Sequence, residues 1–186
     1  MKRVFAMLLF FVILSGCSKN TSEMERGMAL RSKLLQADNC TFIAKITADY
    51  GDKLHVFSVE CQGSQNGDVV FSVMQPETIR GISGKITEEN GALTFDDKVL
   101  YFDKMAEDQI TPVTAPWIFL RTLRSGNITS TCTESGYMRM TIDDSYEEDA
   151  LHLDIWLNQE DCPVRAEIMY DGYRILSLEL EKFLIM

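Results

Sequence analysis

Basic residues are scarce in this chain of 186 residues. Lysine and arginine together number 18, against 28 aspartates and glutamates, so the formal net charge is −10. Proteins that bind nucleic acid place clustered Lys and Arg side chains against the phosphate backbone. The composition therefore excludes nucleic acid as a partner, and it predicts that anionic lipid headgroups repel the body of the protein.

Motifs for catalysis are lacking as well. The two histidines, His55 and His152, fall on separate expected strands without the spacing of zinc ligands. Residues 81–84 (GISG) do not match the G-x-S-x-G nucleophile elbow, and the chain contains no C-x-x-C pair. We therefore expect a binding protein with no catalytic residue, metal or cofactor. A hydrolase is the weakest alternative, because a working pair of carboxylates needs no sequence motif.

The first 17 residues have the order of an export signal. Lys2 and Arg3 precede an apolar run from Val4 to Leu14, and small residues follow it directly. The run is shorter than the roughly 17–25 residues of a membrane span. The final Leu-Ser-Gly-Cys resembles the lipobox of bacterial lipoproteins, which implies cleavage after residue 16 and acylation of Cys17, with palmitate or a similar chain. The alternatives are a terminal helix or an ordinary signal peptide whose Cys17 is accidental.

Cleavage there divides the chain into three parts. Residues 1–16 would be the lipoprotein signal peptide, residues 17–22 the lipidated cysteine with a short polar tether, and residues 23–186 one domain of ordinary size. Residues 23–36 have apolar residues at helical spacing, with Ser22 as the expected N-cap. We predict an amphipathic helix close to the anchor, on the extracytoplasmic face of the cell membrane.

Most of the remaining chain alternates apolar and polar residues, which indicates strands. We expect strands at residues 40–50, 53–61, 68–74, 92–95, 98–102, 128–133, 137–143, 150–157, 164–170 and 173–183. Tight turns separate nearly all of them, which favours antiparallel pairing. The sequence thus predicts one long, curved antiparallel sheet with two helices against its concave face.

A second helix is expected at residues 116–124. Pro116 stands in its first turn, Arg121 and Arg124 come late, and Gly126 follows its end. The segment is apolar on nearly all of its faces, so it is either buried in the core or placed over an apolar ligand. The residues that could line such an apolar cavity as a lid are Trp117, Ile118, Phe119, Leu120 and Leu123.

Four cysteines follow Cys17, and an export signal would place them in an oxidising compartment. Four cysteines permit three pairings. The strands at 40–50 and 53–61 fold back on each other, which brings Cys40 opposite Cys61 or one pair off. We therefore predict disulfides Cys40–Cys61 and Cys132–Cys162, with four buried free thiols as the alternative.

Several segments resemble the LolA/LolB-like lipoprotein-carrier superfamily. They are residues 42–46 (FIAKI), 76–82 (PETIRGI), 93–97 (LTFDD) and 163–168 (PVRAEI), in that order, within a match over roughly residues 24–184. The resemblance implies an α+β fold, a curved antiparallel half-barrel or incomplete β-barrel, with helices over its concave face and an apolar cavity beneath them.

A narrower resemblance is to lipoproteins of spore-forming Firmicutes, including the GerS-type germination lipoproteins. It implies regulation of a cell-wall amidase in sporulation or germination. We predict that the protein is a membrane-anchored, non-catalytic cell-envelope lipoprotein that binds an apolar ligand or a partner protein. Its partners would be the membrane, through the anchor, and an acyl chain, lipid or cell-wall hydrolase. A lipoprotein carrier or receptor is the other alternative.

Residues 143–149 gather five carboxylates in seven positions. Calcium prefers oxygen ligands of this kind, but the segment lacks the spaced pattern and distal Glu of an EF-hand. We expect a solvated hairpin tip rather than a calcium site.

Overall fold

Eleven antiparallel strands form one continuous, unclosed sheet in the computed structural model, which describes residues 19–103, 105–106, 109–147 and 150–186. Their order across the sheet is β6-β5-β4-β3-β2-β1-β13-β12-β11-β10-β9. The strands are β1 (Asn39–Asp49), β2 (Leu54–Ser64), β3 (Val69–Gln75), β4 (Ser83–Ile86), β5 (Gly91–Phe95), β6 (Lys98–Phe102), β9 (Asn127–Glu134), β10 (Tyr137–Asp143), β11 (His152–Leu157), β12 (Pro163–Tyr170) and β13 (Tyr173–Ile185).

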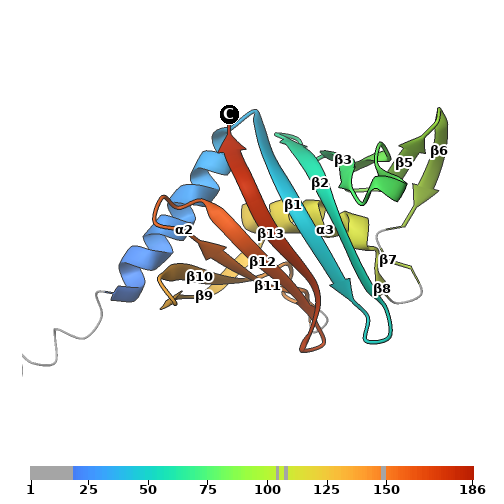
Figure 1. Ribbon diagram of the computed structural model, residues 1–186. Helices are drawn as coiled ribbons and strands as arrows, with labels where there is room; N and C mark the ends of the chain where they lie inside the picture. Colours follow the sequence, from blue (N-terminus) through green and yellow to red (C-terminus); the bar gives the residue numbers. More distant parts are fainter. Residues whose placement is uncertain (1–18, 104, 107–108, 148–149) are drawn as a thin grey trace, which may run out of the picture.

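The sheet curves around two helices, α2 (Lys19–Gln36) and α3 (Ala115–Ser125), as Figure 1 shows. The chain runs as two meanders, from β1 to β6 and from β9 to β13, and pairing of β1 with β13 joins them. Strands β6 and β9 are the two edges, so the barrel stays open. The α+β half-barrel with helices over its concave face, expected from the sequence, is confirmed.

Helix α3 fills the middle of the concave face. Pro116 lies in its first turn, and the N–H of Gly126 caps its end by donating to the carbonyl of Thr122 (2.8 Å). The ring of Phe119 is fully buried between those of Phe42 on β1 and Phe183 on β13, at centroid distances of 5.8 and 6.1 Å. The helix is therefore the centre of the hydrophobic core.

Helix α2 begins at Lys19, earlier than the sequence analysis expected. Ser22 consequently lies inside the helix and is not its N-cap, and residues 19–22 of the expected tether are helical. A side chain at Gly27 would come within 2.7 Å of the Met140 sulfur, so this glycine lets α2 approach β10 closely. The signal peptide and Cys17 lie outside the described residues, and neither described helix is long and apolar enough to cross a bilayer.

The two predicted disulfides are not present, and the four cysteines are free thiols. Cys40 faces Gly63 and Cys61 faces Phe42 in the β1–β2 pairing, so the two cysteines are diagonal neighbours. Diagonal Cα atoms lie about 7–8 Å apart, beyond the usual span of a disulfide. The predicted Cys132–Cys162 bridge is not formed either.

Cys132 belongs to β9, while Cys162 immediately precedes Pro163, the first residue of β12. Strands β10 and β11 therefore lie between the two cysteines, at a spacing of about 4.8 Å per strand. That separation exceeds the roughly 7 Å between Cα atoms that a disulfide can bridge.

Candidate functional site

A pocket of about 430 Å³ opens at the end of the concave face that α3 does not fill. It lies between strands β2 to β5 and the segment that leads into α3, which contains β8 (Gln109–Ile110) and the 3-10 helix η3 (Pro112–Thr114). The residues that line it are Tyr50, His55, Phe57, Val73, Ile79, Ile82, Leu93, Ile110, Thr111, Pro112 and Val113. Its volume falls within the roughly 300–1,000 Å³ of small-molecule sites.

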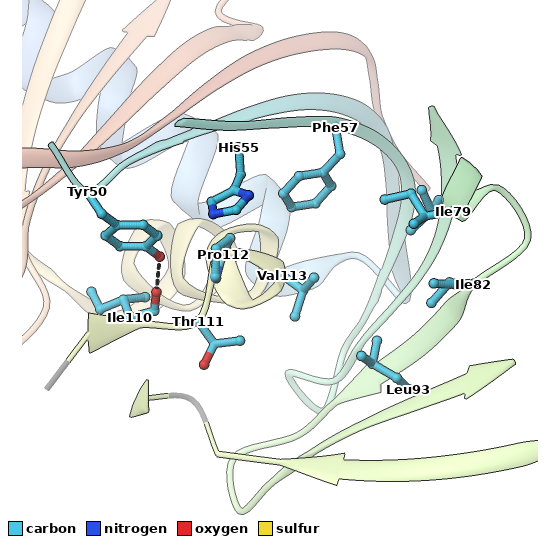
Figure 2. A pocket seen from close by; sticks show the side chains of 11 residues that line it. Tyr50, His55, Phe57, Ile79, Ile82, Leu93, Ile110, Thr111, Pro112 and Val113 are labelled. Atoms are coloured by element: carbon cyan, nitrogen blue, oxygen red, sulfur yellow. Dashed lines mark hydrogen bonds between the residues drawn. The ribbon is translucent and has the colours of Figure 1, made fainter. Parts of the chain in front are cut away.

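The apolar wall comes from strand residues that point inward and from one folded connection. Phe57 on β2 and Val73 on β3 are core-facing positions of their strands and are buried. After β3, residues 76–82 fold back through the 3-10 helix η2 (Glu77–Ile79), and the N–H of Val73 donates to the Ile82 carbonyl (2.8 Å). This connection brings Ile79 and Ile82 to the pocket (Figure 2).

The pocket has a polar end and an apolar end. Tyr50 and His55 stand side by side at one end, their ring centroids 6.3 Å apart, whereas Ile79, Ile82 and Leu93 lie at the other (Figure 2). The Tyr50 hydroxyl donates to the Ile110 carbonyl, and burial raises the pKa of this tyrosine. A few polar groups at one end of an apolar pocket orient a ligand.

An exposed apolar strip continues the pocket along the β5–β6 hairpin. Leu93 on β5 is directly opposite Leu100 on β6, so both side chains lie on the same face of the sheet. Leu100 is 64% exposed and Phe95, on that face too, is 50% exposed. Figure 1 shows this hairpin standing away from the body of the protein. The pocket therefore opens onto apolar surface as well as water.

The five residues on α3 predicted for a cavity or lid are in the core. Trp117, Ile118, Phe119, Leu120 and Leu123 are all buried, and none lines this pocket. The open space lies beyond the helix instead of beneath it, because the side chains of α3 meet those of β1 and β13.

Sequence reasoning missed the residues that do line the pocket. The sequence does show two spaced isoleucines, Ile79 and Ile82, and a break in the pattern at Thr111-Pro112. It does not show that these segments meet at one pocket, because that depends on tertiary contacts.

Two carboxylates of the acidic segment, those of Asp143 and Asp144, pair with neighbouring groups. An oxygen of Asp143 lies 2.6 Å from Nδ1 of His152, and Asp144 accepts the N–H of Leu151 (2.8 Å) and lies 3.5 Å from Arg121. Within the described part of the chain, which omits residues 148–149, no group of three His, Cys, Asp or Glu side chains could hold a metal.

No protein-family model and no curated protein matches the chain, whereas many solved structures do. A LolA superfamily protein from Nitrosomonas europaea is 7% identical, with a TM-score of 0.44 over 91% of this chain and 94% of that one. A putative outer membrane lipoprotein-sorting protein domain from Vibrio parahaemolyticus is 10% identical (TM-score 0.45; 90% and 92% covered).

The lipoprotein LppX from Mycobacterium tuberculosis is 13% identical (TM-score 0.43; 87% and 93% covered). These TM-scores are all below 0.5, so the function proposed next rests on this chain's own residues.

Proposed function

We propose that this protein binds the acyl chain of a lipid or of a lipid-modified protein in the pocket between β2–β5 and η3. The observation that carries the proposal is the pocket itself, lined mainly by apolar side chains and continuous with the exposed strip of Leu93, Leu100 and Phe95. A contiguous, exposed apolar surface of this kind is typical of a binding site. No covalent chemistry is needed for this role.

The volume of the pocket predicts how affinity depends on the length of the acyl chain. Each methylene group moved from water into an apolar site contributes about 0.8 kcal/mol, or about a fourfold change in Kd. A series of straight-chain fatty acids should therefore gain about fourfold in affinity per added carbon until the 430 Å³ is filled. Beyond that length the gain should fall, because the next carbons lie on the exposed β5–β6 strip.

A variant that fills the pocket tests the site directly. Leu93 is half-buried at the pocket wall, and Leu93→Trp would place a bulky indole ring there. Val99→Trp is the matched control, because Val99 lies on the next strand and is 54% exposed outside the pocket. We expect Leu93→Trp to weaken binding of dodecanoate by more than about tenfold, measured by calorimetry, and Val99→Trp to leave it unchanged.

Equal binding by both variants would refute the site. The second observation that we expect is a co-purifying lipid in organic extracts of the protein, identified by mass spectrometry. Absence of any lipid, together with no fatty-acid binding, would contradict the function itself. Recovery of a cell-wall hydrolase in repeated pull-downs, without lipid, would instead support the amidase-regulator alternative from the sequence.

We also propose that the domain works at the membrane surface through a lipid on Cys17. The basis is the order of charge, apolar run and small residues before that cysteine. Two acyl chains hold a protein far more firmly than one. Mass spectrometry of the mature amino terminus should find a diacylglyceryl group on Cys17, and Cys17→Ser should release the protein from membranes. An unmodified mature Cys17 would contradict the anchor without affecting the pocket.

A further inference from the structure

A second pocket, of about 450 Å³, adjoins the first one at Tyr50. Tyr50 and Ile110 line both pockets, and the hydrogen bond from the Tyr50 hydroxyl to the Ile110 carbonyl joins the two residues at this boundary. The rest of the second pocket comes from the turn after β1 and from the β12–β13 hairpin. Its other residues are Asp49, Gly51, Tyr170, Tyr173, Arg174 and Ile175.

The two pockets form one gradient of polarity. The far end of the first pocket is apolar, its near end carries the Tyr50 hydroxyl and the His55 imidazole, and the second pocket adds a carboxylate, a guanidinium and two more phenols. Figure 2 shows the first half of this gradient, from Leu93 and Ile82 to Tyr50. A ligand that fits both pockets must therefore be an amphiphile, with its tail away from Tyr50.

The charged groups of the second pocket have opposite signs. Asp49 accepts the N–H of Gly51 through Oδ1 (2.9 Å), and Nη1 of Arg174 donates to Glu167 (2.9 Å). A carboxylate has two oxygens and a guanidinium has five N–H groups, so these bonds leave both side chains with capacity for a ligand. A headgroup with only negative charge would meet Arg174 but would also be repelled by Asp49.

We propose that the two pockets together bind a single-chain amphiphile with a zwitterionic phosphate–amine headgroup. The tail occupies the first pocket, as in the proposed function on which this inference rests. Arg174 receives the phosphate, since a guanidinium matches its oxygens. Asp49 receives the amine, and Tyr170 and Tyr173 line the same pocket, where aromatic rings attract ammonium and quaternary ammonium groups.

Three probes with the same 12-carbon tail separate the headgroup from the tail. They are dodecylphosphocholine, dodecyl phosphate and tridecanoate, whose carboxyl carbon follows 12 tail carbons, each titrated below its micelle concentration into purified, lipid-stripped protein. We expect dodecylphosphocholine to bind about tenfold more tightly than dodecyl phosphate, through the added ammonium contacts. The comparison is independent of the tail, because all three probes carry the same one.

The matched variants are Asp49→Asn and Asp52→Asn. Asn at position 49 keeps an oxygen for the Gly51 N–H, and Asp52 is an exposed acid of the same turn that does not line the pocket. Asp49→Asn should reduce the preference for phosphocholine over phosphate to within about threefold, while Asp52→Asn should keep it at about tenfold.

The outcomes are distinguishable. Equal affinity for the two phosphate probes, or the same loss in both variants, would overturn the headgroup site while leaving acyl-chain binding intact. Failure of all three probes to bind would instead refute the proposed function, and with it this inference.

Discussion

Replacement of Phe119 by alanine distinguishes a packed core from a cavity wall. The Phe119 side chain is 0% exposed and contacts the rings of Phe42 and Phe183 from the centre of α3. If α3 were the wall of an open ligand cavity, loss of the ring would enlarge that cavity at little cost in stability. Because α3 is packed against β1 and β13, the loss should instead leave a new void in the core.

The size of the effect follows from the contacts. Phe-to-Ala changes in packed cores cost about 3–5 kcal/mol, and aromatic pairs contribute about 0.5–1.5 kcal/mol beyond the area they bury. We expect the free energy of unfolding of Phe119→Ala to fall by about 4 kcal/mol, a large part of the 5–15 kcal/mol typical of a domain. Phe119→Leu, which keeps most of the volume, should lose about 1 kcal/mol.

Urea unfolding of lipid-free protein, followed by far-UV circular dichroism, measures these differences. With a slope of about 2 kcal/mol per molar urea, Phe119→Ala should shift the midpoint by about 2 M. Tyr101→Ala is the control, because Tyr101 is 72% exposed on the edge strand, and it should change stability by less than about 0.5 kcal/mol. A loss below about 1 kcal/mol for Phe119→Ala would refute the packing assigned to α3.

Three further predictions concern other parts of the sheet. Gly63→Ala should destabilise the protein by about 1–3 kcal/mol in urea unfolding, because the new Cβ would lie 2.5 Å from the Leu120 side chain. An unchanged midpoint would show that the Leu120 side chain moves aside without a loss of stability. Burial raises the pKa of the Cys61 thiol, so iodoacetamide at pH 8 should modify it only after unfolding, and rapid labelling of the native protein would contradict its burial. Burial tends to raise the pKa of Glu167, but hydrogen bonds from Arg165 and Arg174 outweigh it and hold that pKa below 4.5. The stability from this carboxylate should therefore be complete above pH 4.5 and be lost as pH falls through the lower native pKa, a loss that Glu167→Gln should not show.

The strands were predictable because alternation of side chains records which face is buried. Residues 137–143 were expected as a strand and form β10 with the same limits, and the last strand was placed two residues short of the end of β13. By contrast, β4 was missed, since it has only four residues and one of them is Gly84. That glycine is needed because the Phe71 ring lies across it, where a Cβ would come within 2.5 Å. The sequence contains no local sign of this contact.

The candidate site was harder to predict than the fold, because its residues share no periodic pattern. Its walls come from a folded connection after β3, from β5, and from the segment of residues 109–113 that precedes α3. Each of these carries apolar residues that also fit an ordinary core. The same ambiguity applies to α3, whose apolar surface fits either a buried helix or a lid; contacts with the sheet bury it in the core.

The position of the pocket follows from a mismatch between the helices and the sheet. Helix α3 has 11 residues, about 16 Å at 1.5 Å per residue, whereas 11 strands at about 4.8 Å spacing make a much wider surface. Helix α2 adds its contacts at the β9–β10 side, so neither of the two α-helices that the structure describes covers the concave face beyond β3. The pocket in that region is lined by apolar residues such as Ile82 and Leu93, which offer an apolar surface to a ligand. A bound acyl chain would complete the core that the protein's own helices leave unfinished, which is why ligand binding should also raise the stability of the fold.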